Sequence, residues 1–164
     1  MRNFLPAAIV LPLLAPWAAQ EANAATATGT LAVTLTIAST CTVTGGTVAF
    51  GSQGVLTSVV SQLGTFTVTC TNATGYTVGL DKGTWGSSVT TRMMKSPTTL
   101  ATVNYSLFSD SGHTTNWGDT SGAWVSGTGN GTAQTLTVYG QIPVQTTPAA
   151  AANYADSVTI TVTY

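Results

Sequence analysis

The sequence predicts an all-β fold, and three observations carry that prediction. Only 5% of the residues are charged, whereas an ordinary globular domain has about 25% and helical bundles favour Glu and Lys. Threonine and other β-branched residues, which favour strands, are abundant. Several segments alternate apolar and polar side chains with the period-2 repeat of half-buried strands, between clusters of turn-forming residues. Because 43% of the residues are hydrophobic, the chain has the material for a packed core.

The charge and metal-ligand content exclude two classes of function. The formal net charge is −1, from 4 basic and 5 acidic residues, so the chain lacks the clustered Lys and Arg that bind nucleic acid. One histidine and two cysteines leave little material for a transition-metal site. We therefore expect no nucleic-acid partner, no metal and no cofactor.

The first 24 residues have the pattern of a cleaved export signal. Arg2 supplies a positive charge, an apolar run follows, and Ala22-Asn23-Ala24 fits the small-x-small motif of a signal-peptidase site. Three prolines interrupt the run, which is shorter than the ~20 residues a membrane-spanning helix needs. The sequence therefore predicts a signal peptide at residues 1–24, with cleavage after Ala24.

Export makes a disulfide the expected state of the two cysteines. Cys41 and Cys70 would reach an oxidising compartment, where an even number of cysteines favours pairing. Two free buried thiols are the alternative.

The mature chain has seven or so predicted strands, which suggests a two-sheet sandwich. Residues 109–134 form a Gly- and Ser-rich loop with one or two short strands at most, and Arg92 to Lys95 is an edge strand. The clearest strands, read from their alternation, are residues 63–71, 76–81, 100–108, 135–142 and 157–164.

Residues 30–44 predict an unusually long strand that carries apolar side chains away from the domain. No Gly, Pro, Asn or Asp interrupts them, and fifteen extended residues span roughly 50 Å. Cys41 would hold the second half to the domain, so the first half would point outward and insert into another structure. Its apolar face consists of Leu31, Val33, Leu35 and Ile37.

The other end of the sequence predicts a complementary gap. The chain stops at Tyr164 on a strong strand, so the sandwich would end one strand early and leave an open groove. One spare strand and one missing strand in each copy favour head-to-tail exchange, which grows a fibre. The alternative is that residues 30–37 fold back, through a bend at residues 38–40, into the groove of their own chain.

Short motifs in a fixed order resemble the spore coat protein U domain family, whose best understood members are subunits of archaic chaperone–usher pili. The resemblance covers nearly all of residues 28–164. It includes Leu35-Thr36-Ile37 with Cys41-Thr42-Val43, Phe50-Gly51, Val68-Thr69-Cys70, residues 76–81, Asn104-Tyr105-Ser106-Leu107-Phe108, Trp117-Gly118-Asp119, residues 138–143, 154–158 and 162–164.

The resemblance implies an incomplete immunoglobulin-like β-sandwich that lacks its last strand and is completed by donor-strand exchange. It implies a donor extension at residues 25–38 and a pilin domain at residues 39–164. Carried over by position, the donor residues are Leu31, Val33, Leu35 and Ile37, and one wall of the acceptor groove is Val158, Ile160 and Val162. The implied partners are further copies of the chain, a periplasmic chaperone, an outer-membrane usher and a tip adhesin.

No catalytic residues are predicted. His113 stands near Asp110 and several serines, but no Gly-x-Ser-x-Gly motif exposes a nucleophile, and Asp81 and Asp156 are too far apart in sequence to indicate an acid–base pair. The predicted function is a structural, non-enzymatic pilus subunit, exported to the cell surface for adhesion and biofilm formation. The alternative is a secreted spore-coat or carbohydrate-binding sandwich that completes its own sheet, with loop tryptophans Trp85, Trp117 and Trp124 available to stack on sugars.

Overall fold

The computed structural model describes residue 21, residues 23–151 and residues 153–164. Most of the predicted signal peptide, residues 1–20 and 22, therefore lies outside the described residues. Within the described part of the chain, no helix is long and apolar enough to cross a membrane.

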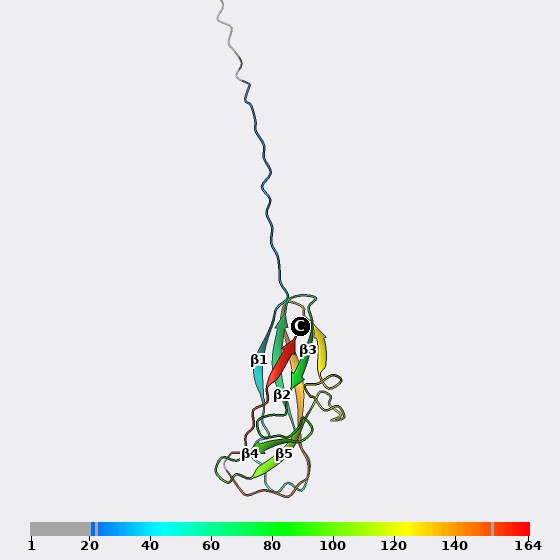
Figure 1. Cartoon of the computed structure of the whole chain (residues 1–164). Helices are drawn as coiled ribbons and strands as arrows, with labels where there is room; N and C mark the ends of the chain where they lie inside the picture. The colour runs from blue at the N-terminus through cyan, green and yellow to red at the C-terminus, as the bar shows by residue number, and fades with distance from the viewer. Residues whose placement is uncertain (1–20, 22, 152) are drawn as a thin grey trace, which may run out of the picture. The chain divides into compact units, whose positions relative to one another are not determined.

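The described residues form strands and loops without helices, so the predicted all-β class is confirmed (Figure 1). All strands pair antiparallel. In chain order they are β1 (Cys41–Val48), β2 (Val60–Cys70), β3 (Gly75–Leu80), β4 (Arg92–Lys95), β5 (Thr102–Phe108), β6 (Val125–Thr128), β7 (Ala133–Ile142) and β8 (Ile160–Thr163).

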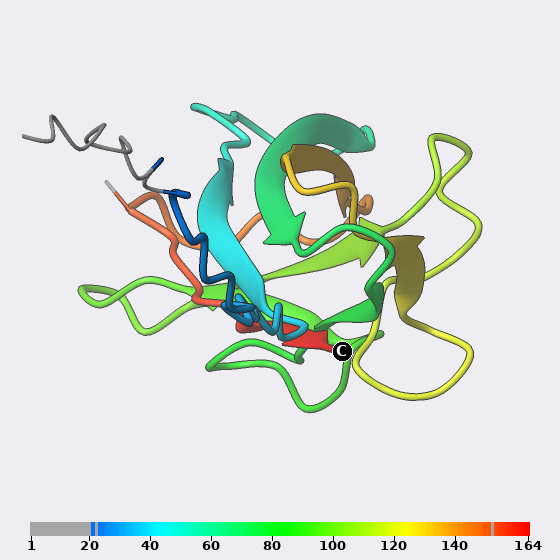
Figure 2. The ribbon, with the colours of Figure 1, turned by 90° about the horizontal axis from the view of Figure 1, so that it is seen from above.

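The strands build the two sheets of the predicted immunoglobulin-like sandwich. The larger sheet has the order β1-β2-β7-β5-β4, and the smaller has the order β6-β3-β8. Ten consecutive residue pairs join β2 to β7, whereas only three join β7 to β5. The larger sheet is therefore curled rather than flat (Figure 2).

The core lies between the two sheets and is built from alternate residues of the strands. Phe66, Val68 and Cys70 of β2 are buried, as are alternate residues of β5 and β7. Trp117, from the loop after β5, is 1% exposed, and its indole N–H donates to the Val78 carbonyl oxygen at 2.9 Å. One of the three loop tryptophans is thus part of the core.

The predicted strand over residues 30–44 is wrong in its limits. β1 begins at Cys41 and continues to Val48 through Gly45 and Gly46, where the pairing with β2 shifts register. A Cβ at Gly46 would overlap the Thr65 carbonyl oxygen, so glycine permits this β-bulge. Residues 30–40 form no strand, because a strand needs a hydrogen-bonded neighbour and alternation alone does not supply one.

The disulfide between Cys41 and Cys70 is present, as predicted. The two residues are direct partners in the β1–β2 ladder, with Cα atoms 4.1 Å apart. The bridge therefore fixes the first residue of β1 to the last residue of β2, at what we call the disulfide end of the domain.

Candidate functional site: an apolar groove between two sheet edges

Two strand edges from opposite sheets lie beside each other without being paired. β1 is the outer strand of the larger sheet and β8 that of the smaller sheet, so each is bonded along one side only in the described chain. Their Cα atoms come within 8 Å of each other. Unpaired N–H and C=O groups on such edges bind a further strand readily.

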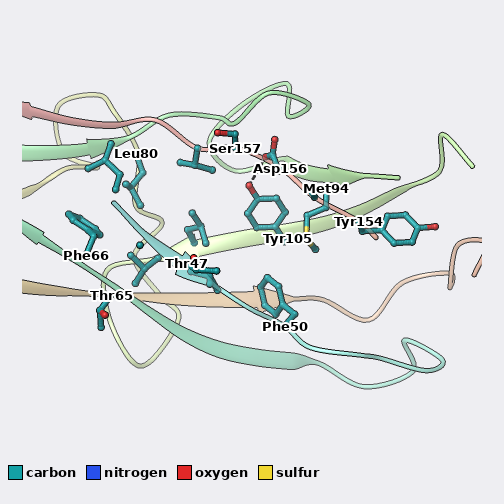
Figure 3. Close-up of a pocket in the computed structure, with 17 residues that line it drawn as sticks. Thr47, Phe50, Thr65, Phe66, Leu80, Met94, Tyr105, Tyr154, Asp156 and Ser157 are labelled. Carbon is teal, nitrogen blue, oxygen red and sulfur yellow. Dashed lines mark hydrogen bonds between the residues drawn. The ribbon is translucent and has the colours of Figure 1, made fainter. Parts of the chain in front are cut away.

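A cavity of about 400 Å³ opens between these edges and reaches the core (Figure 3). Most of its lining is apolar, with aromatic rings along it. The lining residues are Gly46, Thr47, Val48, Phe50, Thr65, Phe66, Leu80, Met94, Tyr105, Leu107, Val138 and residues 154–158 and 160. We call this cavity the groove.

Of the three residues predicted for the groove wall, two line the groove and one does not. Val158 and Ile160 line the groove. Val162 packs against the buried core and is not among the lining residues. The opposite wall comes from β1, β2 and β5, whose residues the sequence did not assign to a site.

The four side chains predicted to form the donor face are all exposed. Leu31, Val33, Leu35 and Ile37 have exposed fractions of 89%, 87%, 85% and 74%. In an extended chain these alternate residues share one face. A continuous apolar face of this kind is unfavourable in water.

The chain segment before β8 is held by an isolated β-bridge between Ala155 and Lys95 of β4 and by hydrogen bonds to two aspartate side chains. The Tyr105 hydroxyl donates to Asp156 Oδ2 at 2.6 Å, and the Thr84 N–H donates to Asp156 Oδ1 at 2.9 Å. The Thr159 N–H donates to Asp81 Oδ1 at 2.8 Å. Tyr105 and Asp156 both line the groove, so these bonds set the position of one of its walls (Figure 3).

The surroundings of Asp81 and Tyr105 shift their pKa values in opposite directions. Burial opposes ionisation of Asp81, but hydrogen bonds from Thr159 and Gly83 and the charge of Arg92 outweigh it and lower the pKa of Asp81. Burial, followed by the hydrogen bond to the Asp156 carboxylate, raises the pKa of Tyr105 far above its usual value. At neutral pH the phenol therefore stays protonated and keeps its hydrogen bond to Asp156.

Arg92 is a functional candidate that the sequence did not reveal. Its strand, β4, is an edge strand as predicted, but the Arg92 side chain is fully buried. The guanidinium donates to the carbonyl oxygens of Leu80 (2.9 Å), Asp81 (2.8 Å), Val89 (2.8 Å) and Trp117 (2.8 Å). Burial lowers the pKa of Arg92, yet an arginine remains charged at every physiological pH.

The loop that contains His113 is arranged as a structural turn. The imidazole packs edge-on against Phe108 and Tyr139, with ring centroids 5.2 and 6.2 Å away. The Asp110 carboxylate accepts the backbone N–H groups of Thr114 and Thr115, which lower its pKa to about 2. Among the described residues, no cluster of three or more His, Cys, Asp or Glu forms a metal site.

Comparison with known proteins identifies the family. The family described as Spore Coat Protein U domain matches residues 27–161. The chain belongs to the spore coat protein U domain family. The matched range contains both predicted elements, the exposed donor face and the groove, and it confirms the resemblance inferred from the motifs.

A solved structure has the same fold as this spore coat protein U domain. It is the chaperone–tip adhesion subunit pre-assembly complex of the archaic chaperone–usher Csu pili of Acinetobacter baumannii. The TM-score is 0.56 and the identity 22%, over 79% of this chain. The match spans 41% of the other chain's length. No curated protein is significantly similar to the sequence.

Proposed function

We propose that this spore coat protein U domain is a subunit of an archaic chaperone–usher pilus and polymerises by donor-strand complementation. The observation that carries the proposal is the groove between two unpaired edges, in a chain that also exposes a four-residue apolar face. The Csu pilus structure supports it, because that complex joins a pilus subunit to its chaperone.

Insertion of the exposed segment of one copy into the groove of another buries the apolar face of the segment and the apolar lining of the groove together. The inserted backbone bonds to the free edges of β1 and β8, and its side chains at alternate positions enter the groove. Complete burial of four Val, Leu or Ile side chains contributes on the order of 6–12 kcal/mol, an upper bound from extended-chain areas. This free energy, together with the backbone hydrogen bonds to the two edges, opposes the entropy cost of association and of ordering the segment.

The proposal assigns a role to each part of the chain. Residues 1–24 direct export and are removed, residues 25–38 are the donor strand, and residues 39–164 are the acceptor domain. Leu31, Val33, Leu35 and Ile37 insert. Val158 and Ile160 form one wall of the acceptor groove, and Val162 of β8 packs against the core. Before assembly a periplasmic chaperone covers the groove, and an outer-membrane usher then adds the subunit to a fibre on the cell surface.

We further propose that the subunit is structural rather than enzymatic and forms the main shaft of a fibre used in adhesion and biofilm formation. The family membership and the Csu pilus structure support a structural role. We include a tip adhesin among the proposed partners, because the Csu complex contains a tip adhesion subunit.

Charged substitutions on the two faces of the donor segment test the proposal. Leu35→Asp with Ile37→Asp, co-expressed with chaperone and usher, should abolish the ladder of polymers seen by electrophoresis without boiling. Thr34→Asp with Thr36→Asp is the matched control, because it places the same charges on the opposite face and should leave the ladder intact. A ladder from the first variant would refute the donor assignment. A wild-type protein that stays monomeric in size-exclusion chromatography would support the self-completed sandwich instead.

A further inference from the structure

An exposed apolar patch lies at the end of the domain away from the disulfide. Its three side chains are exposed by 73%, 52% and 58%, and we call them the valine patch: Val55, Val59 and Val144. Val60 pairs with Ile142 at the ends of β2 and β7 that are remote from Cys70. The Gln145 N–H donates to the Leu56 carbonyl oxygen at 3.2 Å, so the two loops that carry the patch run side by side.

The two strands that border the groove run in opposite directions. β1 begins at Cys41, at the disulfide end, and runs away from it. β3 also begins near this end, after the short turn that follows Cys70, and β8 is antiparallel to β3. β8 therefore runs from Ile160 toward the disulfide end, and its last residues lie there (Figure 1).

These directions decide where a donor copy must sit. Only three residues separate Ile37 from Cys41, about 10 Å of extended chain, so the domain of the donor copy lies directly beyond the groove that holds its strand. A strand inserted parallel to β8 would leave at the disulfide end of the acceptor. Each copy would then have to meet two neighbours with that one end, because its own extension also starts there, at Thr40, which is bonded to Thr71.

Insertion antiparallel to β8 avoids this conflict and places the donor copy next to the valine patch. The inserted strand leaves the groove at the end beside Phe50, which lines the groove just before the patch-bearing loop. The disulfide end of the donor copy then faces the valine patch of the acceptor. The turns at that end, residues 71–74 and 129–132, contain no charged side chain, so they can cover valines without burying a charge.

We propose that the valine patch is a second contact between successive copies, made with the disulfide end of the donor copy. The inference rests on the proposed function and adds a body-to-body contact to strand insertion. It makes the joint between subunits stiffer and assembly faster than insertion alone would allow.

The test separates strand insertion from the body-to-body contact. The exported full chain carrying Val55→Ser, Val59→Ser and Val144→Ser is compared with Leu63→Ser, an equally exposed residue on β2 outside the patch. Polymerisation of the triple variant should be about tenfold slower, the change expected when a small apolar contact is lost. The Leu63 variant should polymerise at the wild-type rate.

A second measurement keeps the two proposals distinguishable. Each variant is also made with Leu35→Asp and Ile37→Asp, so that it accepts strands without donating one, and is titrated with a synthetic peptide of residues 28–39. Equal peptide affinity with slower polymerisation of the triple variant supports the patch. Equal peptide affinity with unchanged polymerisation overturns the patch but leaves strand exchange intact. Loss of peptide binding by every protein, including the chain with wild-type valines, overturns the proposed function itself.

Discussion

Replacement of Arg92 by Met should be among the most damaging single substitutions in the domain. The side chain is fully buried, and its guanidinium donates to four carbonyl oxygens that belong to β3, to the loop before β4 and to the Trp117 segment. Met retains much of the volume but no donor, so these acceptors lose their partner inside the protein. An unsatisfied buried acceptor costs about 1–3 kcal/mol, and partial relaxation reduces the sum to about 3–5 kcal/mol.

That loss is large against the total free energy of unfolding of a domain, about 5–15 kcal/mol. Urea unfolding should be measured with the disulfide intact, in the Leu35→Asp and Ile37→Asp background that prevents polymerisation. Arg92→Lys should lose about 1–3 kcal/mol, because one ammonium group cannot reach four divergent acceptors. The control is Lys95→Met on the same strand, which removes only the contact with the Trp85 ring and should cost below about 1 kcal/mol. If Arg92→Met changes the unfolding free energy by no more than the control, the hydrogen bonds of the buried guanidinium do not stabilise the domain.

Three further predictions concern the disulfide, the β-bulge at Gly46 and the stability of the domain at low pH. Cys41→Ser with Cys70→Ser should lower the unfolding free energy by roughly 3–4 kcal/mol, because the bridge closes a loop with a sequence separation of 29, and calorimetry of the exported protein checks this. Gly46→Val should destabilise more than Gly45→Val in the same urea assay, since a Cβ at Gly46 meets the Thr65 carbonyl oxygen and one at Gly45 meets nothing. Asp81 has a lowered pKa when folded, so its contribution to stability is complete above its unfolded pKa and is lost as the pH falls through the folded value. Asp81→Asn should therefore flatten the acid limb of stability below about pH 4, the usual pKa of an aspartate, and an unchanged limb would exclude that carboxylate as its source.

The strands of the core were predictable because their signal is local. Alternation over β2 and β5 placed Phe66, Val68, Tyr105 and Leu107 on the buried face, and the structure has them there. The start of β1 was not predictable in the same way. The alternation keeps one phase from Leu31 to Val43, with Ser39 as its polar member, yet a ladder forms only where β2 supplies a neighbour.

The contacts of Arg92, Asp81 and Asp156 could not be predicted from the sequence for a different reason. Arg92 binds backbone carbonyl groups, which every residue has, so no pattern of residue types identifies its partners. Asp81 and Asp156 are far apart in sequence, and the fold brings both to the Gly83–Thr84 turn, where each accepts a backbone N–H. Their signal would have been two aspartates at strand ends, which is common and carries little information by itself.

The hydrogen bonds to Asp81 and Asp156 affect how a strand enters the groove. An edge segment with no ladder on one side would ordinarily be mobile, and ordering it would reduce the free energy gained on binding. Here the bonds to Asp81 and Asp156 hold the segment before β8 in place while the groove is empty. A groove fixed in this way meets an incoming strand with little reorganisation, so most of the hydrophobic free energy of insertion remains available to the joint. Under the proposed function the same fixed groove would stay open between synthesis and assembly, and a chaperone that covers it would shield its apolar lining from water.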